Sequence, residues 1–200
     1  MKRPVLDVSA LPPIAYGTRT TIWWGVLGLI MIEGAALAMI VAALFYLRQN
    51  FTAWPPPGTP PPRLLAATVN VVLLVLSVAP MYVVDRAARR ERRLPLLVAL
   101  GVCVFLNLAA VALRGFEFAG LGCRWDAHAY GSAVWTILGM HAAHLIASAI
   151  ENCLLLALFM LGPLERKHFV DAHVNALYWY FIVAVWVPAY AVVFLWPRWS

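Results

Sequence analysis

Charged residues are scarce in this sequence of 200 residues, since Asp, Glu, Lys and Arg make up 12% of it while hydrophobic residues make up 64%. A soluble domain carries about a quarter charged residues, so this chain has too few to cover its own surface in water. Apolar runs of about 20 residues recur along it, each long enough to cross a hydrocarbon core of about 30 Å. The sequence therefore predicts a polytopic membrane protein.

Several chemical signatures are also missing. The three cysteines, Cys103, Cys123 and Cys153, do not have the short spacing of a zinc knuckle, a haem-attachment motif or a paired copper site. No phosphate-binding glycine loop, Gly-x-Ser-x-Gly motif or paired carboxylates occur. The net charge of +6 does not indicate nucleic acid, because its placement follows the ends of the apolar runs. We therefore expect no soluble-type active site, no metal site and no nucleic-acid partner.

The apolar runs predict an all-α bundle of five transmembrane helices, at 20–47, 64–84, 94–114, 130–161 and 172–197. Residues 1–19 would be an N-terminal segment, and 20–200 one transmembrane domain. Ten Lys and Arg residues lie in the N-terminal segment and in the loops after the second and fourth helices. Five lie on the other side: Arg48, Arg63, Arg114, Arg124 and Arg198. Because cytoplasmic loops are enriched in Lys and Arg, the N-terminus is predicted to be cytoplasmic and the C-terminus outside.

The loop between the first two helices has a proline run. Trp54 is followed by three prolines, a Gly-Thr pair and three more prolines, at 55–62. Such a run favours the polyproline conformation, which has no internal hydrogen bonds. We expect an extended strap on the outer face.

Polar residues inside the predicted helices are few. Seven of the nine acidic residues are assigned to loops or helix ends, which leaves Glu33 and Glu151 within the membrane. An unpaired charge there costs at least about 2.5–3.5 kcal/mol. On the fourth helix, His141, His144, Ser148 and Glu151 follow a spacing of i, i+3, i+7 and i+10. They predict one polar stripe that faces protein or water and shares an interior with Glu33.

Three hypotheses compete for this stripe. A haem site is disfavoured, because His141 and His144 lie less than one turn apart on one helix and His173 lies at a different depth. A proton or ion path through the imidazoles and carboxylates is the second. Buried polar contacts that join helices within a bundle or complex are the third, and the sequence favours them.

The motifs around this stripe occur in an order and spacing that resemble subunit III of the haem-copper terminal oxidases. The fourth helix opens with Tyr130-Gly131-Ser132 and continues with Gly139-Met140-His141-Ala142-Ala143-His144. Other positions of the resemblance are Glu33, Arg48, Trp54, Asn70, Ser77, Glu117, Tyr178, Trp179 and Trp186. The last helix departs from the family signature, because Tyr180 replaces a His, Val183 replaces an Asp, and His173 aligns near a usual Glu.

The resemblance implies a cofactor-free accessory subunit of a respiratory oxidase in the bacterial inner membrane. Such a subunit stabilises catalytic subunit I, contacts other oxidase subunits and supports proton uptake during oxygen reduction. The haems and copper would lie in partner subunits, and bound phospholipid is compatible with the resemblance. The five-helix form lacks two helices that create a lipid-holding cleft in seven-helix members, so that cleft is not expected.

Two alternatives to an oxidase subunit remain open. The accessory protein of nitric oxide reductases shares this helix set. An independent membrane transporter or cytochrome is a hypothesis from a different class. A haem spectrum of the isolated chain would favour a cytochrome, whereas co-purification with a haem-copper subunit would favour the family.

Overall fold

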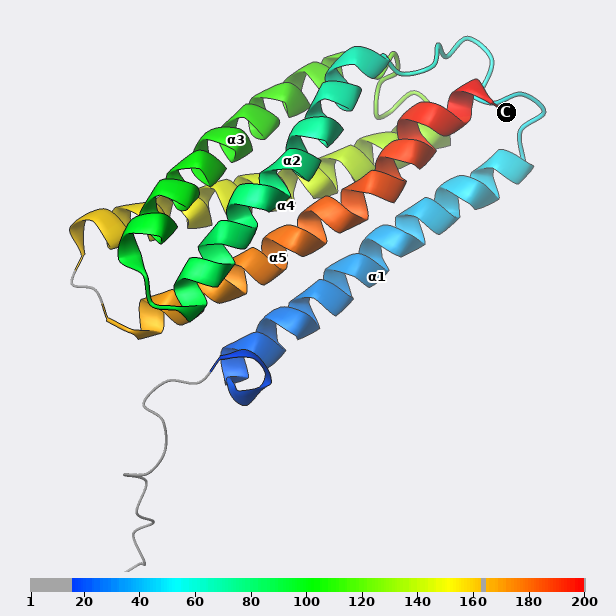
Figure 1. The fold of residues 1–200 in the computed structure, drawn as a ribbon. Helices are drawn as coiled ribbons and strands as arrows, with labels where there is room; N and C mark the ends of the chain where they lie inside the picture. Colours follow the sequence, from blue (N-terminus) through cyan, green and yellow to red (C-terminus); the bar gives the residue numbers. More distant parts are fainter. Residues whose placement is uncertain (1–15, 163–164, 200) are drawn as a thin grey trace, which may run out of the picture.

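The computed structural model describes residues 16–162 and 165–199, and the chain runs up and down through long helices (Figure 1). They are α1 (Thr21–Gln49), α2 (Leu64–Arg89), α3 (Arg93–Ala119), α4 (Ala129–Leu161) and α5 (Lys167–Tyr190). A short turn, η1 (Gly17–Arg19), precedes α1, and η2 (Ala191–Leu195) and η3 (Trp196–Arg198) extend α5. In these ranges five helices, with α5 counted through Arg198, are long and apolar enough to cross a membrane. The predicted all-α fold is confirmed.

The helices extend beyond the apolar runs that predicted them. Helix α2 continues past residue 84 to Arg89, and α3 continues past residue 114 to Ala119. Helix α2 can continue past its apolar run because long arginine side chains reach solvent from a helix end while their methylene groups stay on apolar surface. The predicted N-terminal segment lies mostly outside the described residues.

The last span has a different shape from the expected helix at 172–197. It begins earlier, at Lys167, and its α-helical part ends at Tyr190. Pro188 has no N–H to donate to the carbonyl four residues earlier, which weakens the α-helical pattern at this point. A wider π turn, η2, follows it.

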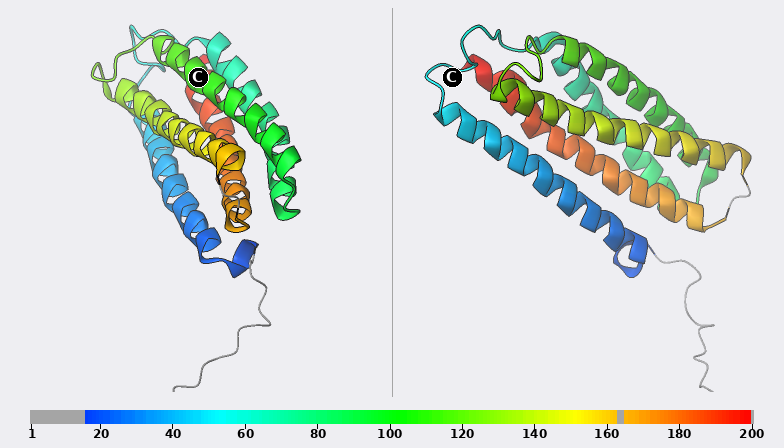
Figure 2. Two further views of the ribbon diagram at one scale, coloured as in Figure 1. Left: turned by 90° about the vertical axis from the view of Figure 1, so that its left-hand side faces the viewer. Right: turned by 180° about the vertical axis from the view of Figure 1, so that it is seen from behind.

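Helices α4 and α5 each pack against three other helices. Helix α5 packs against α1, α2 and α4, and α4 packs against α1, α3 and α5, while α2 and α3 pack against each other. The largest fully buried side chains, Trp179 and Trp186, both come from α5. Helix α1 runs along one side of the bundle in all three views (Figures 1 and 2). Only Leu37 and Leu44 of α1 are buried, so most of its apolar surface faces outward.

The two ends of the bundle differ in composition. The arginine-rich end comprises the α2–α3 turn and the start of α5. The proline-loop end comprises the α1–α2 loop, the α3–α4 loop and the C-terminus. There Trp54 is buried, with its ring 4.8 Å from that of Tyr130 and 5.4 Å from that of Trp196.

The proline loop is not the single extended strap that the sequence predicts. The Thr59 N–H donates to the Pro56 carbonyl at 3.0 Å and closes a turn. Gly58 occupies the left-handed region in this turn, with a φ of 84°, which glycine adopts without steric cost. The loop therefore folds back over the bundle, and Trp54 anchors it there.

Candidate functional site

A buried ion pair lies near the end of α3. Arg114 and Glu117, three residues apart on one helix face, are joined at 2.5 Å, and their side chains are 3% and 0% exposed. Asn70 of α2 donates to the other oxygen of the Glu117 carboxylate. A buried charge is tolerated only when it is paired and hydrogen-bonded, and this carboxylate has partners on both oxygens.

His141 of α4 extends this network. A guanidinium can only donate, so Arg114 Nη2 donates to His141 Nδ1, at 2.8 Å. The opposite nitrogen, Nε2, then carries the proton and donates to the Ile182 carbonyl of α5, at 3.1 Å. These two contacts hold His141 as a neutral imidazole in one tautomer.

Trp186 of α5 completes the network. Its ring stacks on that of His141 with centroids 4.3 Å apart, and the Arg114 guanidinium carbon lies 3.8 Å from the indole centroid. The indole therefore contributes a cation–π contact to the buried guanidinium. We call Asn70, Arg114, Glu117, His141 and Trp186 the closed cluster.

A second carboxylate has a different environment. Glu33 of α1 accepts a hydrogen bond from the Tyr178 hydroxyl of α5 at 2.8 Å. His144 Nε2 of α4 lies 3.6 Å from the other carboxylate oxygen, within ion-pair distance but too far for a hydrogen bond. The Glu33 side chain is 19% exposed and that of His144 is 12% exposed. We call Glu33, His144 and Tyr178 the open site, because its carboxylate retains an unfilled face.

The polar stripe predicted on α4 divides between these two groups. His141 and Ser148 are fully buried, whereas His144 and Glu151 are partly exposed. Residues three apart on a helix differ in direction by about 60°, so His141 faces α3 and α5 while His144 faces α1. Within residues 16–162 and 165–199, Glu151 has no hydrogen bond or ion pair, and the buried Ser148 hydroxyl has no partner. Of the stripe residues expected to share an interior with Glu33, His144 meets it, whereas His141 meets the buried Arg114 instead.

Positions that the sequence singled out separately meet in pairs. Asn70 meets Glu117, and Tyr178 meets Glu33. Trp179 Nε1 donates to Ser77 Oγ at 3.0 Å. Arg48 lies apart from both groups and donates to the Phe51 carbonyl at 3.1 Å, which closes the end of α1.

The Tyr-Gly-Ser segment has a local structural explanation. A Cβ atom on Gly131 would lie 2.4 Å from the Arg124 carbonyl oxygen, so only glycine fits at this close approach. His128 caps the helix here, because its Nδ1 accepts from the Gly131 N–H at 2.9 Å. His128 Nε2 lies 2.8 Å from the Thr59 hydroxyl, which links the proline loop to the start of α4.

Comparison with known proteins shows the family of this chain. The family profile described as cytochrome c oxidase subunit III matches residues 15–198. The chain belongs to this family.

Individual members of the family are distant in sequence. The cytochrome c oxidase subunit 3 of a Synechocystis strain is 26% identical over 178 residues, which is 86% of this chain and 74% of that protein. The subunits 3 of Pongo pygmaeus and Ornithorhynchus anatinus are 24% and 25% identical over 144 residues, or 72% of this chain. The chain spans about half, 55%, of the length of these two mammalian relatives.

Two charged residues near the end of α3 lie deeper in the bundle than the sequence predicts. Arg114 was assigned to the outer side of the membrane and Glu117 to a helix end, but both are buried in α3. The signal was available, because an Arg–Glu pair at i, i+3 is typical of neighbours on one helix face. Without Arg114 the count of Lys and Arg becomes ten to four. The predicted orientation, which no contact here tests, is therefore not weakened.

The departures from the family signature lie on α5, and the structure places each of them. His173 Nδ1 lies 2.6 Å from the Asp85 carboxylate, at the arginine-rich end and far from His141. The Tyr180 hydroxyl is buried without a partner in the described part of the chain. Val183 is buried in the apolar core. Across the same residues, no three His, Cys, Asp or Glu side chains are grouped so that they could hold a metal ion.

Proposed function

We propose that this chain is a cofactor-free accessory subunit of a respiratory terminal oxidase in a bacterial inner membrane. It stabilises catalytic subunit I and supports proton uptake during oxygen reduction, while the haems and copper reside in partner subunits. Membership of the subunit III family supports this assignment, and the relatives named above favour an oxidase over a nitric oxide reductase. An independent transporter or cytochrome is disfavoured for the same reason.

The open site is the observation that carries the proposal. Glu33 lies on the helix with the fewest buried residues, and its carboxylate is neither fully buried nor fully bonded. On the other side of α1, away from Glu33, large apolar side chains point outward, among them Met31, Ile32 and Met39, each about two-thirds exposed or more. This outward apolar surface suits contact with another membrane subunit, and the carboxylate on the inward side of α1 needs a partner or water.

The closed cluster suits a structural role instead. All of its charged and imidazole groups are engaged with one another or with backbone, so moving a proton through it would break the network. It joins α2, α3, α4 and α5 and defines how these helices pack. Support of proton uptake is therefore assigned to the open site alone.

The test is to purify the oxidase complex with and without this chain. The complex that lacks it should keep its haem absorbance and its initial rate of oxygen consumption, but it should lose activity faster during sustained turnover. Optical spectra and the time course of oxygen consumption measure these two properties. If haem absorbance disappears stoichiometrically with the chain while the other subunits stay folded, the chain is not a cofactor-free accessory subunit.

A further inference from the structure

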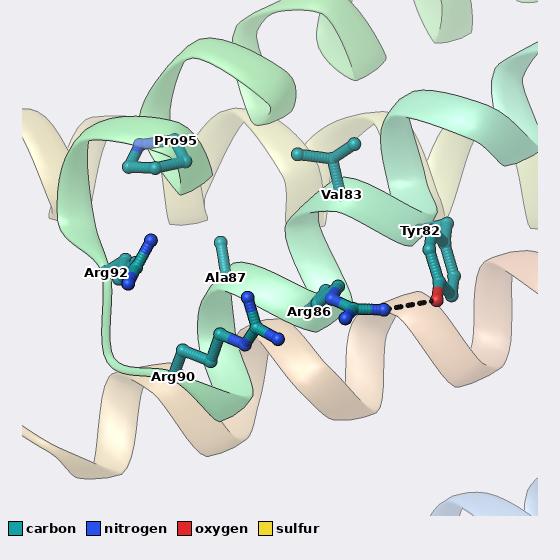
Figure 3. A pocket seen from close by; sticks show the side chains of 7 residues that line it. All are labelled: Tyr82, Val83, Arg86, Ala87, Arg90, Arg92 and Pro95. Atoms are coloured by element: carbon teal, nitrogen blue, oxygen red, sulfur yellow. Dashed lines mark hydrogen bonds between the residues drawn. The ribbon is translucent and has the colours of Figure 1, made fainter.

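A small pocket lies at the arginine-rich end, where α2 ends and α3 begins (Figure 3). Its volume is about 150 Å³. Three arginines line it, namely Arg86, Arg90 and Arg92. The rest of its wall comes from Tyr82, Val83, Ala87 and Pro95. The pocket therefore combines a cationic rim with a largely apolar floor.

The positive charge in this pocket is not cancelled within the described part of the chain. Arg86 donates to the Tyr82 hydroxyl at 2.9 Å, a neutral partner. Arg90 and Arg92 have no hydrogen bond or ion pair to residues 16–162 and 165–199. Three guanidinium groups at one concavity create a strongly positive local potential.

The nearest carboxylates are engaged elsewhere. Asp85 accepts from Arg89 at 3.1 Å and contacts His173 at 2.6 Å. Glu91 pairs with Arg166 at 3.1 Å. Neither acid remains to neutralise the pocket, so an anion from outside the chain would be bound there without competition.

The pocket adjoins the surface that faces the membrane. Val83 is 45% exposed on α2, and Leu94 and Val98 on α3 are 73% and 64% exposed. An excess of arginine at a helix end is enough to orient a chain in the membrane, but orientation does not require unpaired guanidinium groups around a concave, apolar floor. The arrangement fits a ligand that has both an anionic group and alkyl chains.

We propose that this pocket binds the phosphate headgroup of an anionic phospholipid. Arginine binds phosphate oxygens through paired N–H donors, and basic pockets between transmembrane helices are suited to anionic lipid headgroups. The acyl chains lie along Leu94 and Val98. A free phosphate ion shares the headgroup chemistry but leaves the apolar surface beside the pocket unused. This inference does not depend on the proposed oxidase function.

The experiment uses the protein purified in mild detergent with the subunits that accompany it, after removal of bound lipid. Native mass spectrometry then follows titration with phosphatidylglycerol, phosphatidylcholine or inorganic phosphate. Phosphatidylglycerol should bind well above phosphatidylcholine, and millimolar inorganic phosphate should not displace it. Arg90→Gln and Arg92→Gln should each weaken phosphatidylglycerol binding about fivefold, the effect expected of one arginine near an anionic lipid.

Lys167→Gln is the matched control, because it removes one positive charge at the same end of the bundle, from a lysine paired with Glu165. It should leave lipid binding unchanged. Arg90→Lys keeps the charge that orients the chain, and it should bind lipid more strongly than Arg90→Gln.

Several results would overturn the proposal. Equal binding of the two lipids, or displacement of phosphatidylglycerol by inorganic phosphate, would exclude an anionic phospholipid site. An equal loss in Lys167→Gln would indicate diffuse surface charge instead of this pocket. Cross-linking from Arg92→Cys to an acidic segment of an accompanying subunit would show that protein covers the pocket.

Discussion

Glu117 and Glu33 are both carboxylates within transmembrane helices, yet they differ in burial and in the number of hydrogen bonds that they accept. Glu117 is fully buried and accepts from Arg114 and Asn70, whereas Glu33 is 19% exposed and accepts one hydrogen bond, from Tyr178. The closed cluster draws side chains from four helices that pack tightly. The open site lies between α1, α4 and α5, on the side where α1 is loosely packed.

This difference distinguishes a carboxylate whose bonding partners lie within the chain from one that has bonding capacity left for its surroundings. Both oxygens of Glu117 and both ring nitrogens of His141 have partners within the chain, so the closed cluster should contribute to folding. Asn70 Oδ1, Arg114 Nε and Trp186 Nε1 are the polar atoms of the cluster without a hydrogen bond in the described residues. Glu33 and His144 retain unfilled bonding capacity, since both side chains are partly exposed and His144 Nδ1 has no partner in the described residues. The open site should therefore matter mainly in the assembled complex.

The largest expected effect concerns the closed cluster. Glu117→Leu would leave the Arg114 guanidinium buried without its counter-ion, and breaking a buried pair in this way costs about 3–5 kcal/mol. The free energy of unfolding in detergent, measured by denaturant titration, should fall by that amount. The double variant Arg114→Met/Glu117→Leu buries no charge and should recover much of the loss. A single variant as stable as the parent protein would remove the distinction between the two sites.

A smaller effect is expected when Glu33 loses its polar group. Glu33→Leu leaves the Tyr178 hydroxyl without its acceptor and His144 without its ion-pair partner, at a cost of about 1–3 kcal/mol for an unsatisfied buried group. Glu33→Gln can still accept and donate, so the chain should remain in the purified complex. Subunit composition after purification in mild detergent measures this. Loss of the chain from the Glu33→Gln complex would show that a charge, not a hydrogen bond, is required.

Tyr178→Phe sharpens the comparison by removing one donor while leaving the ring in place. It should lower the free energy of unfolding by about 0.5–1.5 kcal/mol, the typical net value of one hydrogen bond. Trp179→Phe, which removes the bond to Ser77 one position along α5, provides a control at a fully buried site. If Tyr178→Phe costs as much as Glu117→Leu, the open site is as essential to folding as the closed cluster.

The smallest effect is expected at Ser148, which lies on α4 about one turn beyond His144. Its buried hydroxyl has no partner in the described chain, so Ser148→Ala removes a desolvated polar atom and no hydrogen bond. The unfolding free energy should fall by no more than about 0.5 kcal/mol. A loss above about 1 kcal/mol would reveal a partner for this hydroxyl, such as a bound water.

The sequence predicted the helices well, because apolar runs must span the hydrocarbon core whatever they pack against. It predicted that Glu33 and His144 share an environment, and these two side chains do meet. It could not predict the division of the α4 stripe, because that depends on which helices flank α4. Arg114 was missed for a related reason: a charged residue ends an apolar run, although the helix continues and buries it.

Glu33 and Tyr178 are 145 residues apart in the chain, and this distance has a consequence during synthesis. A ribosome adds about 5–20 residues per second, so α1 precedes its hydrogen-bond donor on α5 by roughly 7–30 seconds. For most of that interval neither α4 nor α5, which supply the partners of this carboxylate, has been synthesised. Glu33 must then wait near the membrane surface or beside another protein that shields it from the hydrocarbon core. Docking of α1 is therefore a late event in the biogenesis of this bundle, although α1 is the first helix made.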